Sequence, residues 1–311
     1  MVGVKKKNKK NPIKETPADR IYLFLVYALV TGVLIVTLYP LLWIVSASIS
    51  DPQYVASGQM WLYPMGITFE GFELILGNDF IWQGYRNTIF YTIVGTAINL
   101  IVTIPVAYAL SRPEFLGKNL FMTFLIIPMF IGGGLVPTML LLQNLGWTNT
   151  IWVMIIPGAT SLFNIVITRT FFQSTIPREM EEAAIMDGCN DYSMFIRIVL
   201  PLSLPIIAVM ALFFGVGHWN NWFNALILIR NRALWPLQLV LREILVEQNM
   251  GTMGEFGGMD ATTAELQIRR QQMAQVMRYG VMIVSTLPII MVYPFLQKYF
   301  VKGVMIGSIK G

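Results

Sequence analysis

Long apolar runs alternate with short polar segments along the chain, and this alternation sets the predicted architecture. A helix needs roughly 20 mostly apolar residues to cross a hydrocarbon core of about 30 Å, because its backbone groups must bond internally there. Six runs meet this length. We therefore expect an all-α integral membrane protein with six transmembrane helices, at approximately residues 21–48, 88–111, 120–142, 151–172, 204–229 and 279–296.

The polar segments decide the orientation, since cytoplasmic flanks carry an excess of Lys and Arg. Seven basic residues lie within the N-terminal tail, residues 1–20. Lysines also follow the second and last runs, at Lys118, Lys298, Lys302 and Lys310. We expect both termini in the cytoplasm, a membrane domain over 21–300 and a C-terminal tail over 301–311. Gly303 and Gly307 lead us to expect no helix past Val301 in that tail.

Composition narrows the class of protein. Of 311 residues, 55% are hydrophobic and only 13% are charged, which excludes an ordinary soluble domain and gives no sign of a nucleic-acid partner. Cys189 is the only cysteine, so no intrachain disulfide can form. With one histidine in the chain, neither a metal cluster nor an intramembrane Cys-His enzyme is expected. The first apolar run is much longer than a signal-peptide core, so we expect no cleaved leader.

A compact charged segment, residues 177–201, falls on the predicted cytoplasmic side. It contains EEAAIMDGCNDYSMFIRIVLP. Pro177 suits the first turn of a short helix, Gly188 suits a left-handed stop, and Asn190 or Asp191 can cap a second helix. The small side chains of Ala183 and Ala184 favour close approach by another protein. We predict a helix-turn-helix docking element; the alternative is a solvated connector.

The same segment resembles the EAA-x3-G-x9-I-x-LP loop of permease subunits in bacterial ABC importers. The residues that match and are implied to couple the subunit to its ATPase are Glu182, Ala183, Ala184, Gly188, Ile198, Leu200 and Pro201. The number of spans and the long outer loop resemble the maltose-type sugar permeases. SDPQYVASGQMWLYP at residues 50–64 and the ending YFVKGVMIGSIKG resemble the subgroup for complex or acidic oligosaccharides, of aldouronate or rhamnogalacturonan type.

This resemblance implies a type I ABC importer permease fold with a cytoplasmic coupling helix, in a bacterial plasma membrane. It also implies the partners: a second homologous permease, two cytoplasmic ATPase subunits, an extracellular solute-binding protein and an oligosaccharide substrate. The chain has no phosphate loop of the form G-x-x-x-x-G-K-S/T. We therefore expect no enzyme activity here, with ATP and Mg bound by the partner ATPase. The cluster Gly132–Gly134 favours a close helix crossing or a local break.

A candidate substrate path lies near the end of the fifth run, where the chain reads HWNNWFN. Aromatic faces and amide groups are the side chains that bind sugars. We expect Trp219 and Trp222 to share one helix face and Asn220 and Asn224 another. The alternative is an aromatic belt at the membrane interface. The candidate residues are His218, Trp219, Asn220, Asn221, Trp222 and Asn224.

The predicted outer loop, residues 230–278, carries six arginines and five acidic residues. Such a near balance argues against a broad field that attracts acidic sugars. We expect this loop, and Arg269 with Arg270 in particular, to dock the binding protein through ion pairs.

The alternative function is an ion-coupled secondary sugar transporter, which needs ionisable groups inside the membrane. His218 is the candidate for such a group. A lone histidine near an aqueous end is, however, more typical of a hydrogen-bonded structural residue.

Overall fold

The computed structural model describes residues 16–251 and 261–307, which are helical and contain no strand. The first helices are α1 (Pro17–Ser48), α2 (Pro52–Ala56), α3 (Glu70–Leu76), α4 (Asp79–Ser111), α5 (Lys118–Phe130), α6 (Leu135–Asn144), α7 (Trp152–Ile155) and α8 (Leu162–Thr175). Then come α9 (Arg178–Met186), α10 (Asp191–Met194), a π-helix (Phe195–Val199), α11 (Leu200–Leu202), α12 (Leu204–Trp219), α13 (Phe223–Leu228), a 3-10 turn (Arg232–Leu234), α14 (Leu237–Gly251) and α15 (Ala261–Gly307). Most of the basic N-terminal tail and the last four residues lie outside the described residues.

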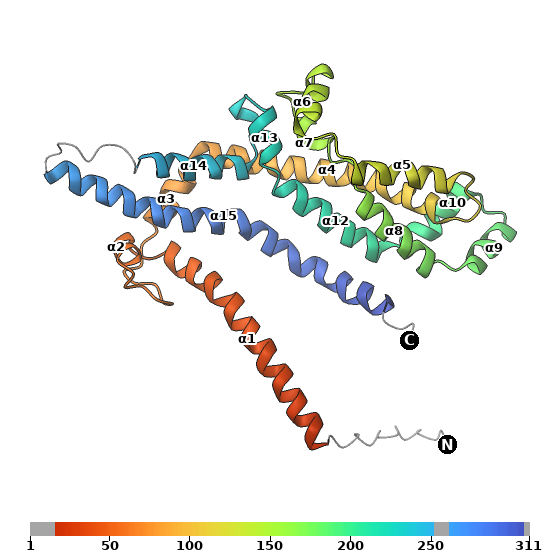
Figure 1. Ribbon diagram of the computed structural model, residues 1–311, viewed down its shortest axis with the longest axis horizontal. Coiled ribbons are helices and arrows are strands. Elements are labelled where there is room, and N and C mark those ends of the chain that lie inside the picture. Colours follow the sequence, from red (N-terminus) through yellow and green to blue (C-terminus); the bar gives the residue numbers. More distant parts are fainter. Residues whose placement is uncertain (1–15, 252–260, 308–311) are drawn as a thin grey trace, which may run out of the picture.

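Helix α4 is the central element of the bundle. It packs against α8 and α12, and α12 in turn packs against α15 (Figure 1). Polar groups on α4 also hold the segment before α14. The Asn87 amide donates to the carbonyl of Ala233 at 2.8 Å, and Thr88 Oγ1 accepts from the amide of Leu237 at 2.8 Å. Buried hydrogen bonds of this kind fix neighbouring elements in register.

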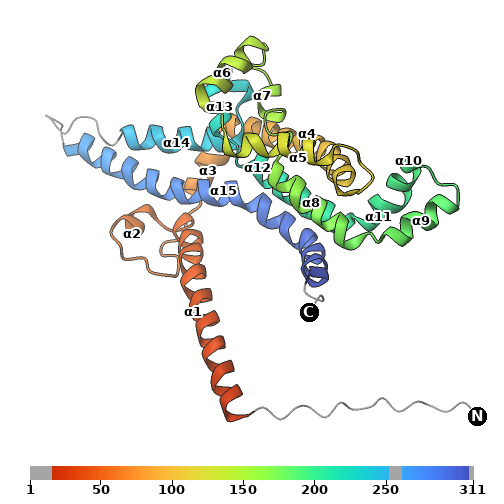
Figure 2. The same cartoon turned by 45° about the vertical axis from the view of Figure 1, so that its right-hand side comes forward.

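The two ends of the molecule differ in the elements they carry. Helices α9 and α10 lie at one end, whereas α14 and the start of α15 lie at the opposite end (Figure 1, Figure 2). Helix α15 runs along most of the distance between these ends.

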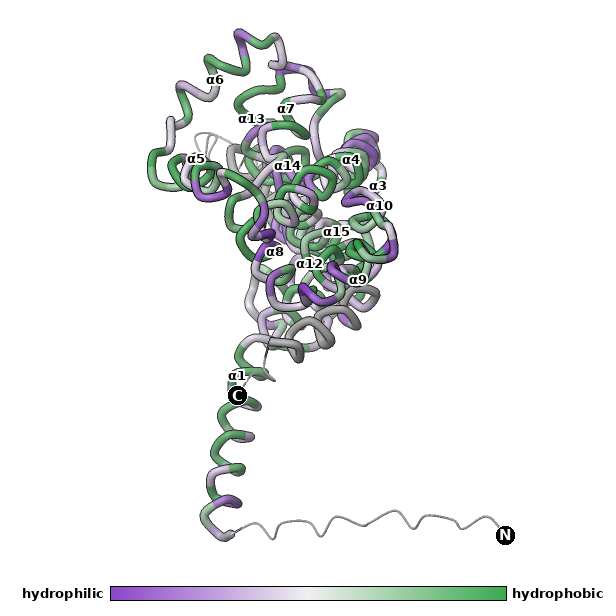
Figure 3. The backbone as a smooth tube through the Cα atoms, turned by 90° about the vertical axis from the view of Figure 1, so that its right-hand side faces the viewer, coloured by the Kyte–Doolittle hydropathy of each residue, from purple (hydrophilic) through white to green (hydrophobic). Residues whose placement is uncertain are grey.

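Helix α1 leaves the bundle. Its C-terminal end packs on α15, where the rings of Trp43 and Tyr279 meet edge to face at 5.0 Å. The remainder is apolar and none of its most apolar window is buried (Figure 3). A helix that is hydrophobic all round and not buried by its own chain must be covered by lipid or by another subunit.

Length and apolar character identify three helices that can cross a membrane within the described residues: α1, α4 and the segment Gln272–Pro294 of α15. The number rises to five if each of two bent pairs is one span. The chain is therefore a helical membrane protein.

Three of the predicted spans are wrong as continuous helices. The run 120–142 is divided into α5 and α6, which meet at 115°. Gly132 and Gly133 lie in the break, and Gly134 has φ +81°, a conformation that side chains disfavour. The glycine cluster therefore forms a local break, which is one of the two alternatives expected from the sequence.

The run 151–172 is divided into the short α7 and α8, with Pro157 and Gly158 between them. The run 204–229 is divided after Trp219, where the chain turns before α13. A further bend of 77° lies at Ser203. Pro205 has no N–H to donate to the carbonyl of Pro201, so the helix cannot continue regularly there.

The last predicted span is too short. Helix α15 starts at Ala261 and ends at Gly307, so it includes part of the predicted outer loop and most of the predicted tail. The expectation that the helix ends at Val301 is wrong. Intrinsic propensity is weak, and a long helix that is already formed can extend through two glycines.

Candidate functional site

The predicted docking element at residues 177–201 begins with α9. Pro177 precedes the helix with φ −65°, and Glu179 and Glu181 occupy its first turn, where the helix dipole favours acidic side chains. The helix ends in a Schellman turn. The amide of Gly188 donates to the carbonyl of Ile185 and the amide of Cys189 to that of Ala184, both at 2.9 Å. Gly188 has φ +78°, so the left-handed stop is confirmed.

The second half of the element starts at Asn190. Its side-chain oxygen accepts from the amide of Ser193 at 2.8 Å, which settles which of the two candidate residues caps this helix. The helix widens to a π-helix over Phe195–Val199 and ends at Leu202. The predicted helix-turn-helix is therefore present, and a bend rather than a smooth entry joins it to α12.

The residues of the recognised motif do not all face the same way. Glu182, Ala183 and Gly188 are exposed, as is Pro201. Ala184 is buried in an apolar cluster with Phe172 and Met194, so the expectation that both alanines present a flat outer surface is wrong for Ala184. Ile198 and Leu200 pack against the same cluster. Large apolar side chains instead dominate the tip, where Met186 is 86% exposed.

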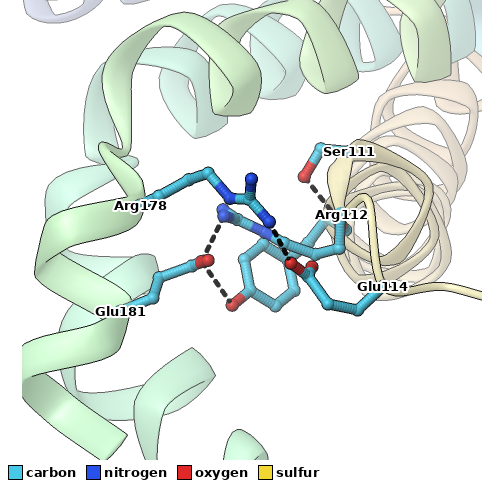
Figure 4. A network of polar contacts seen from close by, with 6 residues as sticks. Ser111, Arg112, Glu114, Arg178 and Glu181 are labelled. Atoms are coloured by element: carbon cyan, nitrogen blue, oxygen red, sulfur yellow. Dashed lines mark hydrogen bonds and ion pairs between the residues drawn. The ribbon is translucent and has the colours of Figure 1, made fainter.

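Ionic contacts join α9 to the end of α4 (Figure 4). Arg112, which follows the last residue of α4, pairs with Glu181, and Arg178 pairs with Glu114. The Tyr108 hydroxyl donates to Glu181 Oε1 at 3.3 Å. Glu114 accepts hydrogen bonds from its own backbone amide and from Arg178, which lowers the pKa of its carboxyl group.

These contacts border a pocket of about 480 Å³ between the two elements. It is lined by Tyr108, Ala109, Arg112, Glu114, Phe115, Arg178, Glu181, Glu182, Ile185, Asp191 and Met194. Sequence reasoning missed Tyr108 and Arg112. The available signal was an arginine directly after an apolar run, with a glutamate two positions later. Arg178 and Glu181 lie on another segment that the sequence predicts to be on the same side of the membrane.

The candidate residues of the predicted substrate path differ in burial. His218 and Trp219 are buried. His218 Nε2 lies 2.8 Å from Asn99 Oδ1, and Trp219 Nε1 donates to the carbonyl of Ser285 at 3.0 Å. Both polar groups have protein partners, so neither side chain is available to a sugar in this structure. His218 is thus buried and hydrogen-bonded, as its sequence context favoured.

The remaining candidates lie around the turn between α12 and α13. Asn220 is exposed, and Asn221, Trp222 and Asn224 are half-buried. The guanidinium of Arg242 lies 4.2 Å from the centre of a Trp222 ring. The expected helix faces are wrong, because α12 ends at Trp219 and Trp222 is the N-cap of the next helix, α13.

The predicted docking arginines lie at the start of α15. Arg269 is exposed and its Nη2 atom is 3.9 Å from Glu70 Oε1. A polar pocket of about 380 Å³ adjoins this pair and is lined by Asp51, Pro52, Gln53, Thr68, Glu70, Arg269, Gln272 and Met273. The side chain of Arg270 lies outside the described residues.

Comparison with known proteins finds membrane transport proteins among the relatives of this chain. The curated relatives include Protein LplC of Bacillus subtilis (strain 168), 37% identical over 95% of this chain and 97% of LplC. The polygalacturonan/rhamnogalacturonan transport system permease protein YtcP of the same strain is 33% identical over 94% of this chain and 99% of YtcP. A chain in the crystal structure of a bacterial ABC transporter involved in the import of the acidic polysaccharide alginate is 32% identical, with a TM-score of 0.78 over 93% of this chain and 99% of that chain.

A profile of a protein family covers most of the chain, residues 81–306. Its description is binding-protein-dependent transport system inner membrane component. Such a component is a membrane permease, and the ATPase of these systems is a separate subunit. The match spans the docking element, the bent helices and most of α15, so this chain belongs to the family of binding-protein-dependent transport system inner membrane components.

Proposed function

We propose that this chain is the permease subunit of an ATP-driven importer that moves oligosaccharides across a bacterial plasma membrane. The observation that carries the proposal is the element at residues 177–201, an ordered helix-turn-helix at one end of an apolar bundle, on which the motif residues Glu182, Ala183 and Gly188 are exposed. Family membership supplies the transport role.

In this proposal the chain crosses the membrane six times and both termini are cytoplasmic. The crossings are α1, α4, the α5–α6 pair, the α7–α8 pair, the bent α10–α12 segment and α15. Support comes from basic groups near α9: Arg112 and Arg178 form ion pairs there, and Lys118 follows Arg112 by six positions in the sequence. These charges follow the rule for cytoplasmic flanks.

The coupling helix α9 docks on one of two cytoplasmic ATPase subunits, which bind ATP and Mg. Its tip has the properties of a contact surface: Ile185 and Met186 are exposed apolar residues beside the tight turn at Gly188. Exposed apolar groups of this size favour burial against a partner. The conformational change in the ATPase is thereby delivered to the permease.

A second, homologous permease completes the translocation path. The apolar surface of α1, which its own chain leaves uncovered, supports a partner subunit at this helix. An extracellular solute-binding protein delivers the cargo to the opposite end, where Arg269, Arg270 and the pocket near Glu70 are the proposed contact.

The cargo class rests on the relatives, whose names include rhamnogalacturonan and alginate transport. Asn220, Asn221, Trp222 and Asn224 are the proposed sugar contacts, because amide groups and an aromatic face lie together at this turn. Of the original candidates, His218 and Trp219 position this turn through their buried hydrogen bonds.

The test is reconstitution of the complete complex in liposomes with a loaded binding protein outside and ATP inside. We expect uptake of oligosaccharide that requires ATP and persists with a protonophore and a sodium ionophore. Uptake that persists without ATP and collapses with an ionophore would instead support the ion-coupled alternative.

A further inference from the structure

The coupling helix α9 is joined to the C-terminal end of α4 by two ion pairs that differ in burial. The side chains of Arg112 and Glu181 are 14% and 13% exposed, whereas those of Arg178 and Glu114 are 62% and 64% exposed (Figure 4). Exposed ion pairs contribute little because water and salt screen them. Only the Arg112–Glu181 pair is shielded enough to hold the two elements in a fixed geometry.

Glu181 is held from two directions by groups of α4 and its C-cap. The Arg112 guanidinium pairs with its carboxylate, and the Tyr108 hydroxyl donates to the same Oε1 atom. The guanidinium also lies 4.5 Å from the centre of the Tyr108 ring, so the ring limits where Arg112 can point. Together these contacts fix the first turn of α9 against the end of α4.

The pair matters mechanically because α4 and α9 are distant along the chain. Tyr108 and Glu181 are 73 positions apart. Among the described helices, extensive packing joins α4 to α8, α12 and α14, whereas α9 meets α4 more sparsely, in the apolar cluster that contains Ala184, Ala107 and Leu110 and at these ion pairs. A displacement of α9 passes along the backbone to α8 and α10, and the Arg112–Glu181 pair is the shielded polar link that carries it directly to the end of α4.

We propose that Arg112 and Glu181 are positioning residues that make α4 follow the coupling helix when the ATPase subunits close. This inference rests on the proposed function. Neither residue contacts the sugar or the nucleotide. Their task is to carry the displacement of α9 into the helix on which the bundle is packed.

The first test uses the reconstituted complex and measures two rates, oligosaccharide uptake and ATP hydrolysis. For Arg112→Gln and for Glu181→Gln we expect the uptake per ATP hydrolysed to fall about tenfold, within the range of coupling between contacting residues. The charge-swapped variant, Arg112→Glu with Glu181→Arg, restores most of the ratio. Glu114→Gln removes the exposed pair and is the matched control, with a ratio that stays within about twofold of wild type.

The second test separates a transmitting contact from one that only aids folding. Cysteines replace Arg112 and Glu181 in a Cys189→Ser background, with the other subunits free of reactive thiols. We expect this complex to hydrolyse ATP with poor uptake and to recover uptake when a short bis-maleimide joins the two cysteines, because the link replaces the ion pair.

Two results would overturn the inference. One is a normal uptake-to-hydrolysis ratio in both single variants; the other is a cross-link that abolishes uptake, which would mean that α4 and α9 must separate. Failure of the proposed function gives a different result, since the wild-type complex itself would then show no ATP-driven uptake. Co-purification of the ATPase with each variant verifies that the complexes have assembled.

Discussion

His218 Nε2 lies 2.8 Å from Asn99 Oδ1, and the imidazole ring rests directly on Gly95. Asn99 also donates to the carbonyl of Gly158, at the joint between α7 and α8. One asparagine on α4 therefore ties α12 and a helix break together. The absence of a side chain at Gly95 is what lets the ring lie close enough to α4 for this contact.

A methyl group at Gly95 should disturb this contact. A Cβ there would overlap the His218 ring, so we expect Gly95→Ala to destabilise the protein by about 1–3 kcal/mol, as overpacking of a core does. The matched control is Gly217→Ala on α12, where a Cβ meets nothing within 4 Å. That change should be neutral or stabilising, because alanine favours helix by about 1 kcal/mol over glycine.

Unfolding of the purified protein in detergent measures both effects. Adding His218→Ala to Gly95→Ala should recover part of the loss, since the overlapping ring is then gone. Strictly additive effects of the two changes would refute the overlap.

The Schellman turn at the end of α9, the proposed coupling helix, predicts a residue-specific effect at Gly188. An L-residue with a branched side chain at φ +78° is strained by about 1–2 kcal/mol, so Gly188→Val should distort the turn and reduce both ATPase co-purification and uptake. Gly188→Asn is the control, because asparagine tolerates the left-handed region. Equal losses of co-purification and uptake in Gly188→Val and Gly188→Asn would indicate that the left-handed turn itself is not required for ATPase binding.

Cys189 is a natural reporter of orientation. It is the only cysteine of the sequence, and it is half-buried next to the turn that ends α9. We expect a membrane-impermeant maleimide to leave it unmodified in intact cells and to react in inside-out vesicles stripped of the ATPase. Cys189→Ser provides the blank. Labelling from the outside of intact cells would reverse the proposed topology.

Arg269 and Glu70 form a long, exposed ion pair at 3.9 Å, so Arg269→Ala should change the free energy of unfolding by no more than about 1 kcal/mol. Its effect should be on docking: stimulation of ATP hydrolysis by the loaded binding protein weakens, and the difference from wild type shrinks as salt is raised. Arg232→Ala is a control at another arginine of the same predicted loop, which pairs with the half-buried Glu243. A defect limited to acidic glycans would place Arg269 in the cargo path instead.

Local signals predicted the helix-turn-helix at residues 177–201 well. Gly188 and Asn190 act on their immediate neighbours, and the structure contains both the left-handed turn and the cap. The breaks within spans were harder to predict, because a count of apolar residues does not register the dihedral angles at Gly134 or the missing N–H of Pro205. The Arg112–Glu181 pair depends on how α4 and α9 meet in space, which no local pattern contains.

The corner between α5 and α6 has a consequence for where water and protein must lie. Helix α5 has 13 residues and is therefore about 20 Å long, too short to cross the hydrocarbon layer alone. The exposed backbone of Gly132 and Gly133 has carbonyl and amide groups that hydrocarbon cannot satisfy. This corner accordingly belongs in contact with an aqueous vestibule or with polar groups of a neighbouring subunit, and acyl chains are excluded from it.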